Sequence, residues 1–500
     1  MKIPQNILFA FTLFTVASIN ADSHFESSSL KNDAFSLYAQ ATESLVLRNP
    51  YGSKANIESA HFSYWYDNSD SEINSHTLVQ QLEVMEAIYY SLIIDRQYLD
   101  PIKNAKMNIY MEDAGGIKPD GDIDGVYVGE DPDGYLFIYM TKRQLSNSDE
   151  HIRALLSHEF FHTIQFEYID KNQVQSTFHD YFWFQEGSAS WGSYDAWNDP
   201  ELFSHWGLWA QAIKPELTLT YSSFDNYSEA PAQHMYGTSL FLYWITHSYT
   251  GPNFIQQVLL EMEKTRQSTE VYPAPLDVMN RLLTEEYGLS LKTIYSDYAA
   301  HNILWDYPSG ESYREFLKSI DIKLDSHLSE SHSTISSNWR WIKKSVWNGA
   351  PQSWGASYIR LNTTGLDEIE LSFHGESKGR LNSNGEWRLT LVMVDNEQQI
   401  SYLKIDLDDT GNIFAKLINT KEFSAIYLSA TVFATKNDIN ETFNFAYQLS
   451  AQGESTKYQP EVKPELLLMS KSGGSGAFGF LILLVGLINI YRFVIFSKKV

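Results

Sequence analysis

Two histidines stand four residues apart in the stretch LLSHEFFHTIQFEY, and a glutamate directly follows the first of them. Residues i and i+4 of a helix share one face, so His158 and His162 can each place a ring nitrogen about 2 Å from one zinc ion. Glu159 then lies beside the metal, where a carboxylate can act as a general base. The opposite side of the helix is expected to be buried, leaving the histidine side to face a cleft, because it carries Ile152, Leu156, Phe160 and Ile164. The alternative is a core helix with two satisfied histidines, since three fixed positions also arise by chance.

A third candidate ligand follows in the segment DYFWFQEGSASWGSYDAW. A catalytic zinc site typically has three protein ligands and one open position. Glu186 begins a second helical stretch in this segment and supplies the carboxylate that the two histidines lack. Small side chains allow two helices to approach closely, so this helix is expected to bring Glu186 to the histidines. The small residues directly after it are Gly187, Ser188, Ala189 and Ser190.

Together these two segments resemble a known zinc core. H-E-x-x-H followed by W-F-Q-E-G-S-A-S is similar to the core of the gluzincin metallopeptidases, and most similar to the W-L-N-E-G-F-A-S block of the alanyl-aminopeptidase-like family. The resemblance implies that His158, His162 and Glu186 bind zinc and that Glu159 is the general base of peptide hydrolysis. It covers only this part of the chain and implies a zincin-like fold for the region around it.

The stretch APAQHMYGTSLFLYW contains the candidates for a hydrogen-bond donor to the tetrahedral oxyanion. Gluzincins usually supply this donor from a tyrosine or histidine downstream of the zinc ligands. Tyr236 is expected at the start of a helix beside Gly237, whereas His234 has the family's Y-x-x-G spacing to the same glycine. Tyr236 is the first choice and His234 the alternative, and core packing explains either residue without a catalytic role.

Peptide substrate recognition departs from the aminopeptidase pattern. The aminopeptidases hold a free N-terminus with a G-x-M-E-N strand, and this sequence has no such strand before the zinc helix. It has GYLFIYMTK instead, and a strand in this place forms the sheet edge that pairs with extended substrate in zincins. Endoproteolysis is therefore the expected activity.

A second metal signal stands in PDGDIDGVYVGED. Asp120, Asp122, Asp124 and Gly125 match the first half of a D-x-D-x-D-G calcium loop, but its twelfth position is Asp131 instead of glutamate. Strands, and not two helices, are expected on either side of it. Calcium is therefore an additional candidate cofactor beside zinc, and D-G turns in a solvated hairpin are the alternative.

The elements around these motifs predict an α+β fold. Strand patterns such as AHFSYWY and AKMNIYME suggest a mixed sheet near the N-terminus, and helical patterns dominate from Glu150 to about Leu317. These form a zincin-like metallopeptidase domain over residues 22–345. Short alternating strands then predict an antiparallel β-sandwich over residues 350–450, followed by a polar linker over residues 451–472.

Both ends of the chain carry export signals. Residues 1–21 contain Lys2, an apolar run and a small residue at Ala21, which predicts a cleaved signal peptide; a short membrane anchor is the alternative. Residues 477–496 are mostly apolar and long enough for one transmembrane helix, and they are followed by Lys498 and Lys499.

The order of glycine pair, apolar helix and basic tip over residues 473–500 resembles the GlyGly-CTERM sorting signal of Gram-negative bacteria. The resemblance implies transient anchoring in the inner membrane, cleavage near Gly473 and Gly474 by a rhombosortase-type protease, and delivery by secretion machinery to the cell surface or medium. The basic residues here are scattered, so permanent anchoring is the alternative.

Composition restricts the chemistry further. The chain has no cysteine, so any metal must be held by His, Asp or Glu. Its formal charge of -25 argues against nucleic acid as a partner, because phosphates would be repelled. The sequence thus predicts an exported zinc peptidase acting on peptides or proteins. The alternative is a surface binding or adhesion protein that keeps a zincin scaffold without turnover and uses the β-sandwich as its working part.

Overall fold

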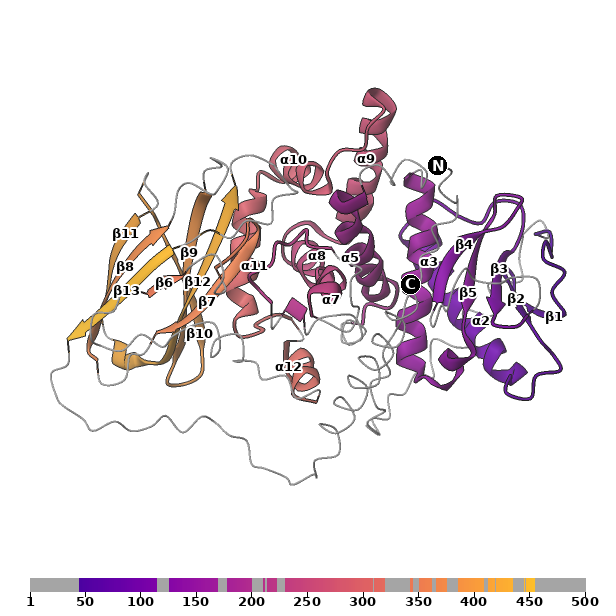
Figure 1. Cartoon of the computed structure of the whole chain (residues 1–500), viewed down its shortest axis with the longest axis horizontal. Coiled ribbons are helices and arrows are strands. Elements are labelled where there is room, and N and C mark those ends of the chain that lie inside the picture. Colours follow the sequence, from indigo (N-terminus) through magenta and orange to yellow (C-terminus); the bar gives the residue numbers. More distant parts are fainter. Residues whose placement is uncertain are drawn as a thin grey trace, which may run out of the picture. The chain divides into compact units, whose positions relative to one another are not determined.

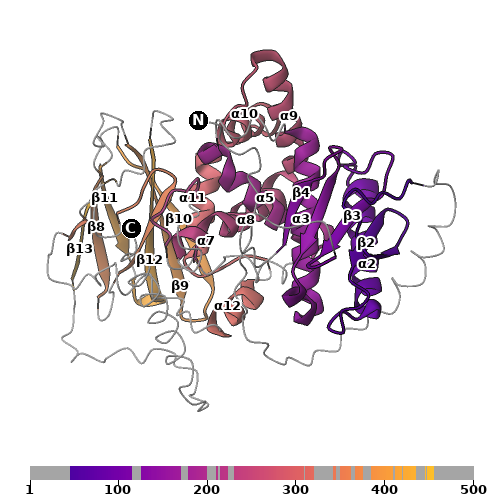
Figure 2. The same cartoon turned by 45° about the vertical axis from the view of Figure 1, so that its right-hand side comes forward.

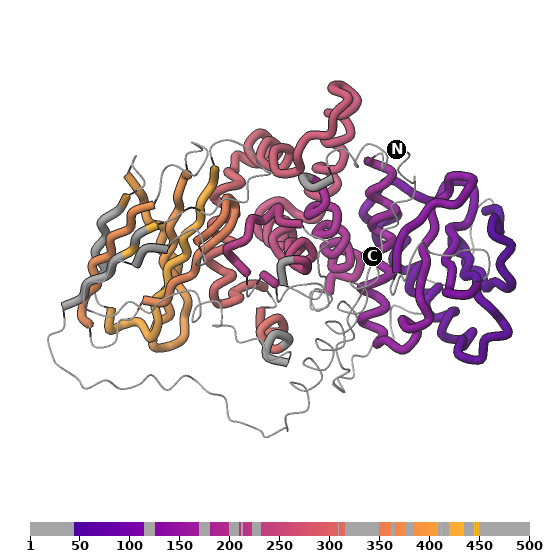
Figure 3. Tube along the Cα trace, in the orientation of Figure 1, coloured from indigo at the N-terminus to yellow at the C-terminus, as the bar shows by residue number. Residues whose placement is uncertain are grey.

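The computed structural model of the chain contains helices and three β-sheets. It describes residues 45–114, 126–169, 178–199, 210–211, 214–222, 230–308, 310–319, 342–344, 350–361, 366–375, 385–408, 412–418, 420–434, 445 and 447–454, and Figure 3 traces the chain. The predicted signal peptide, the loop with Asp120, Asp122 and Asp124, and the predicted transmembrane segment 477–496 lie outside these residues. No helix in the described ranges is long and apolar enough to cross a membrane.

The N-terminal part contains a mixed five-stranded sheet in the order β1-β2-β3-β5-β4. Strands β2, β3 and β5 run parallel, and β1 and β4 are antiparallel to their neighbours. All five residues of β3 are buried, as expected of a central parallel strand covered on both faces. The strands are β1 (Ala55–Glu58), β2 (Phe62–Tyr66), β3 (Met107–Met111), β4 (Val126–Glu130) and β5 (Leu136–Met140).

The strand directly before helix α3 (Asp149–Tyr168) is not the sheet edge, so that prediction was wrong. Strand β5, which lies within GYLFIYMTK, is hydrogen-bonded to β3 on one side and to β4 on the other. A turn after Asp131 connects β4 to β5, and the amide of Gly134 in this turn donates to the Asp131 carbonyl at 2.9 Å. Because β5 pairs with β3 on its other side, β4 lies outside β5 in the sheet. Gly134 adopts a φ of 86°, which favours glycine. The edge strands of this sheet are therefore β1 and β4, and β4 is the one beside β5.

Helices dominate the middle of the chain, as predicted. Helix α3 packs against β4 and β5, and Figures 1 and 2 both show α5 on its other side. The helices are α2 (Ser75–Tyr89), α3 (Asp149–Tyr168), α5 (Phe178–Trp197), α7 (Ala230–Gly237), α8 (Ser239–Ile245), α9 (Phe254–Thr269), α10 (Pro275–Tyr287), α11 (Leu291–Asn302) and α12 (Gly310–Ser319). Together with the first sheet they confirm a mixed α and β fold.

The strand-rich C-terminal part forms two four-stranded antiparallel sheets, β10-β9-β12-β7 and β11-β8-β13-β6. Both sheets contribute to one hydrophobic cluster, in which the rings of Phe373, Trp387 and Tyr447 meet. Strand β6 and the end of β13 extend beyond the expected bounds of 350–450. The strands are β6 (Ile342–Lys344), β7 (Gly355–Leu361), β8 (Glu368–Gly375), β9 (Gly385–Asp395), β10 (Ile400–Ile405), β11 (Asn412–Ile418), β12 (Phe423–Ala434) and β13 (Tyr447–Glu454).

Helix α11 packs on the sheet that contains β9 and β12. The Tyr295 ring meets the buried Phe433 ring edge-on, with centroids 5.9 Å apart. The hydroxyls of Ser296 and Thr431 lie 3.0 Å apart between the same two elements. Residues of β7, β9 and β12 accordingly belong to the hydrophobic cluster of the helices. The helical part and this sheet share one core.

Candidate metal centre

Helix α3 has a capping residue and acidic residues at its N-terminus, and it is buried along most of its length. The Ser148 side chain caps it by accepting from the amide of His151, and Asp149 and Glu150 place negative charge in its first turn. The predicted apolar stripe is buried, but so is the opposite side: His158 is 0% and His162 3% exposed. The expectation that the histidines face a cleft therefore fails among the described residues. The reason is that α5 packs directly against that side.

Helix α5 begins earlier than the sequence predicted. It starts at Phe178, so Glu186 lies inside the helix instead of at its beginning. The aromatic residues before Glu186 are buried: Phe182, Trp183 and Phe184 are each 0% exposed. This apolar segment is what extends the helix toward its N-terminus. A mid-helix position gives Glu186 a backbone fixed on both sides.

Two glycines of α5 permit close packing on opposite sides of the helix. A Cβ atom on Gly192 would lie 2.4 Å from the Phe161 ring of α3. A Cβ atom on Gly187 would lie 2.2 Å from the hydroxyl of Thr238, between α7 and α8. The predicted close approach to α3 is therefore present, but the glycine responsible is Gly192 and not Gly187. The Ser193 hydroxyl adds a bond of 2.8 Å to the Ala154 carbonyl of α3.

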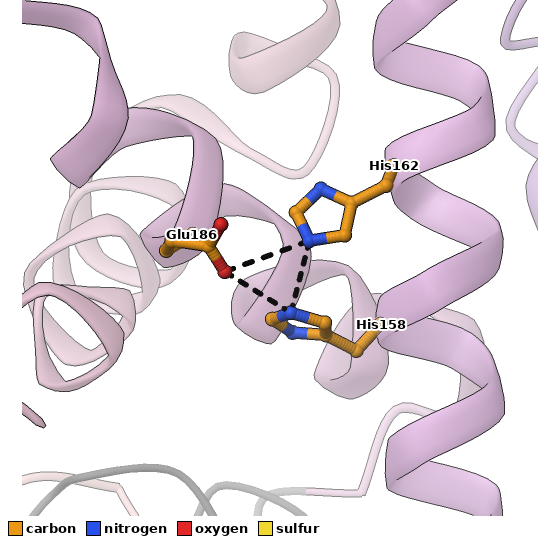
Figure 4. Close-up of side chains that lie close together, drawn as sticks. All are labelled: His158, His162 and Glu186. Carbon is orange, nitrogen blue, oxygen red and sulfur yellow. Dashed lines mark hydrogen bonds and ion pairs between the residues drawn. The ribbon is translucent and has the colours of Figure 1, made fainter. Parts of the chain in front are cut away.

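The three predicted ligands meet at one point between α3 and α5 (Figure 4). The Nε2 atoms of His158 and His162 are 3.0 Å apart. Oε2 of Glu186 lies 3.3 Å from the first and 3.5 Å from the second. Among the described residues, these three form the group with the donor types and spacing to hold a metal ion. The predicted grouping is confirmed.

The triangle of these atoms fits a tetrahedral metal ion. Ligand atoms about 2.0–2.1 Å from zinc at tetrahedral angles lie about 3.3–3.4 Å from one another. The three observed separations, 3.0, 3.3 and 3.5 Å, surround that value. Two imidazoles and one carboxylate also match the donor set of catalytic zinc sites, which keep a fourth position open. The residues present therefore fit zinc.

The outward-facing nitrogens of both imidazoles are also in contact with polar groups. Nδ1 of His158 lies 3.2 Å from the Ser190 hydroxyl of α5, and Nδ1 of His162 lies 2.8 Å from Oε1 of Gln165. Partners of this kind orient metal-bound histidines. Sequence reasoning placed Ser190 only as a small residue and missed Gln165. Its spacing of three residues from His162 on one helix was the available signal.

Glu159 directly follows the first of the two histidines on α3. Its side chain is 0% exposed, and neither carboxylate oxygen has a hydrogen-bond partner among the described residues. Burial raises the pKa of Glu159 to about 8. A buried carboxylate without partners is costly, so its presence beside a metal-binding group points to a proton-handling role.

The three ligands influence each other's charge strongly. Burial lowers the pKa of His158 to about 4. Burial also acts to lower the pKa of His162, but the Glu186 carboxylate outweighs it and raises that pKa to about 9. For Glu186, burial acts to raise the pKa, yet the two histidines bring it below its usual value. The site thus keeps an anionic carboxylate, and a proton and a metal ion compete for the same imidazole nitrogens.

The two candidates for the oxyanion donor lie in different surroundings. Tyr236 is in the last turn of α7, not at the start of a helix, and its ring centroid is 6.0 Å from that of His158. His234 is 1% exposed and has Nε2 within 3.1 Å of the Gln211 amide nitrogen, and burial lowers its pKa to about 3. The structure places the Tyr236 ring beside the ring of His158 and directs His234 toward Gln211.

Of the predicted calcium loop, the structure describes only positions 7 to 12, in which strand β4 (Val126–Glu130) is followed by Asp131 at the last position. This carboxylate is 5% exposed and accepts from the amides of Asp133 and Tyr135 at 2.9 and 3.0 Å. Its other oxygen receives Arg48 at 2.7 Å. Oδ1 of Asp131 is therefore engaged within the β4–β5 turn, and Oδ2 is engaged in an ion pair with Arg48.

Comparison with known proteins identifies a family but no activity. The family of unknown function DUF6055 matches residues 59–450, a range that includes strands β2 to β5 of the mixed sheet, the candidate metal ligands and most of the sandwich. The chain belongs to the DUF6055 family. No curated protein matches this DUF6055 member.

Among solved structures, the DUF6055 chain is similar to the CBM22-1–GH10 modules of endo-1,4-β-D-xylanase 10B from Clostridium thermocellum, crystallised with xylohexaose. The identity is 15%, the match covers 25% of this chain and 26% of that chain, and the TM-score is 0.16. The chain thus spans about a quarter of that structure, and the likeness supports no functional argument.

Proposed function

We propose that this DUF6055 protein is an exported zinc-dependent peptidase of the gluzincin type. The observation that carries the proposal is the triangle of His158, His162 and Glu186, whose ligand atoms are 3.0–3.5 Å apart, with the unpartnered carboxylate of Glu159 on the same helix. Satisfied core histidines do not require a third converging carboxylate or a buried acid beside them.

The side chains divide the chemistry between them. Zinc supplies a Lewis acid for the peptide carbonyl and lowers the pKa of water. Glu159 accepts the proton of the attacking water and returns it to the leaving amine. Tyr236, beside His158, is the donor that we assign to the oxyanion, and Tyr236→Phe should lower kcat while zinc content stays the same.

The sheet supports endopeptidase action at a different strand from the one the sequence indicated. Strand β4 is one of the two edge strands of the sheet and packs against α3, which carries His158 and His162. The outer side of an edge strand is where an extended peptide can add as a further strand. An internal stretch of chain suits such pairing, because it requires no pocket for a free N-terminus.

Removal of the metal should abolish peptide cleavage. The purified protein is expected to cleave casein or a labelled peptide, to lose that activity with a strong chelator, and to regain it when Zn²⁺ is returned. The same sample should cleave an N-terminally blocked peptide, which distinguishes endopeptidase from aminopeptidase action. A folded, zinc-loaded protein without turnover on any of these substrates would favour the binding or adhesion role instead.

Export and tail processing complete the proposal. The N-terminal segment and the order of Gly473, Gly474 and the apolar segment 477–496 support passage through the inner membrane and release by a rhombosortase-type protease. Intact-mass analysis of protein from the native cells should show a chain that begins after Ala21 and ends near Gly474. Recovery of only full-length, membrane-extracted chain would contradict the processing.

A further inference from the structure

Gln165 lies between the second histidine ligand and the turn of α5 that carries the third ligand. Its amide nitrogen donates to the Gln185 carbonyl at 2.9 Å and to the Ser188 hydroxyl at 2.8 Å, while its oxygen lies 2.8 Å from Nδ1 of His162. Gln185 and Ser188 stand on either side of Glu186 in the sequence. Gln165 is 1% exposed, so these three contacts are made away from water.

The direction of these bonds selects the tautomer of the neutral His162 ring. A backbone carbonyl can only accept, so the side of Gln165 that faces Gln185 must be its NH₂ group. The amide oxygen then faces His162, and it too can only accept. Nδ1 of His162 must therefore carry a proton, which leaves the lone pair of the neutral ring on Nε2, the atom that meets His158 and Glu186.

Ser190 makes the corresponding contact to the other histidine. Its hydroxyl is 3.2 Å from Nδ1 of His158, and the side chain is 0% exposed. Ser190 lies one helical turn after Glu186, on the side of α5 that faces α3. Each histidine thus contacts, through Nδ1, a polar side chain that belongs to α5 near Glu186 or is hydrogen-bonded to that part of α5.

We propose that Gln165 is the principal positioning residue of the metal centre: it holds His162 in the Nδ1–H tautomer and couples that ligand to the backbone around Glu186, with Ser190 assisting at His158. The inference rests on the proposed function, because it assumes that a cation occupies the triangle. It goes beyond that function in assigning the selection of the ligand tautomer to an amide of this chain.

The test is zinc affinity of the full protein, measured with Zn²⁺ alone by competition with a chelator of known affinity. Gln165→Met keeps the length of the side chain but removes the acceptor for His162 and both donors. It should weaken zinc binding by about 10–100-fold. Ser190→Ala should weaken it less, because the 3.2 Å contact is longer.

Matched controls separate positioning from general destabilisation. Gln81→Met replaces another buried glutamine, which accepts from the Tyr64 hydroxyl at 2.9 Å, and Ser193→Ala removes a buried serine of α5 that bonds only the Ala154 carbonyl. Both controls should lower the melting temperature as much as their partners while leaving zinc affinity unchanged.

Three outcomes overturn the inference in distinguishable ways. If Gln165→Met binds zinc as tightly as the parent, Gln165 does not position the metal ligands, and the proposed function is unaffected. If Gln81→Met loses as much zinc affinity as Gln165→Met, the loss is explained by reduced stability of the fold and not by positioning. A parent chain that does not bind zinc overturns the inference and the proposed function together.

Discussion

Glu159→Gln should abolish most of the turnover while leaving one zinc ion per chain. The substitution keeps the size of the side chain but removes the group that accepts a proton, and a general base typically contributes about 10²–10⁴-fold to the rate. The fold should tolerate the change, because burial already disfavours the charged form of this unpartnered carboxylate. The measurement is kcat on a labelled peptide, beside metal analysis and a melting curve of the same sample.

The control for this variant is a partly buried glutamate on a neighbouring helix. Glu86 of α2 accepts from the ring of His61 at 2.7 Å and takes no part in the metal centre. Glu86→Gln should therefore leave both kcat and zinc content near those of the parent. Wild-type turnover in Glu159→Gln would rule out Glu159 as the base.

Glu186→Ala should behave in the opposite way and lose the metal itself. It removes the only carboxylate of the triangle, leaving two imidazoles on a single helix and no ligand from α5. The loss of zinc affinity should exceed the 10–100-fold that changes to partners of the ligands typically cost. Activity should disappear together with the bound zinc and return only partly at high Zn²⁺ concentration.

Asp195→Ala is the matched control, because Asp195 is a second buried acid of α5 and pairs with Arg96 at 2.9 Å. That variant should be less stable, yet its folded fraction should keep one zinc ion per chain. Zinc held as tightly by Glu186→Ala as by the parent would contradict the assignment of the third ligand.

The grouping of His158, His162 and Glu186 was predictable because local rules place these residues. A spacing of four residues puts two histidines on one helical face whatever the surrounding fold, and the small residues after Glu186 indicated close helix contact. The position of the edge strand was not predictable, since it depends on a hairpin that returns β4 to the outer side of β5. Strand order is decided by non-local hydrogen bonds that leave no periodicity in the sequence.

Two further features could not be predicted from the sequence: which glycine of α5 contacts α3, and that Gln165 contacts the backbone of α5. Gly187 and Gly192 are both small residues of one helix, and only the rotation of α5 decides which of them faces Phe161. The residues next to Gln165 in the sequence do not indicate that its side chain donates to the Gln185 carbonyl of α5, because that contact depends on how the two helices pack.

The shared core of α11 and the sheet with β9 and β12 affects how variants of the sandwich should be interpreted. Phe433 lies in the same cluster as Tyr295, so a cavity opened on the sheet side loosens the helices as well. Reduced turnover in such a variant is then a consequence of mechanical coupling through packed side chains. It does not show that the sheets bind substrate, and assigning them a recognition role requires a substitution on their solvent-facing side.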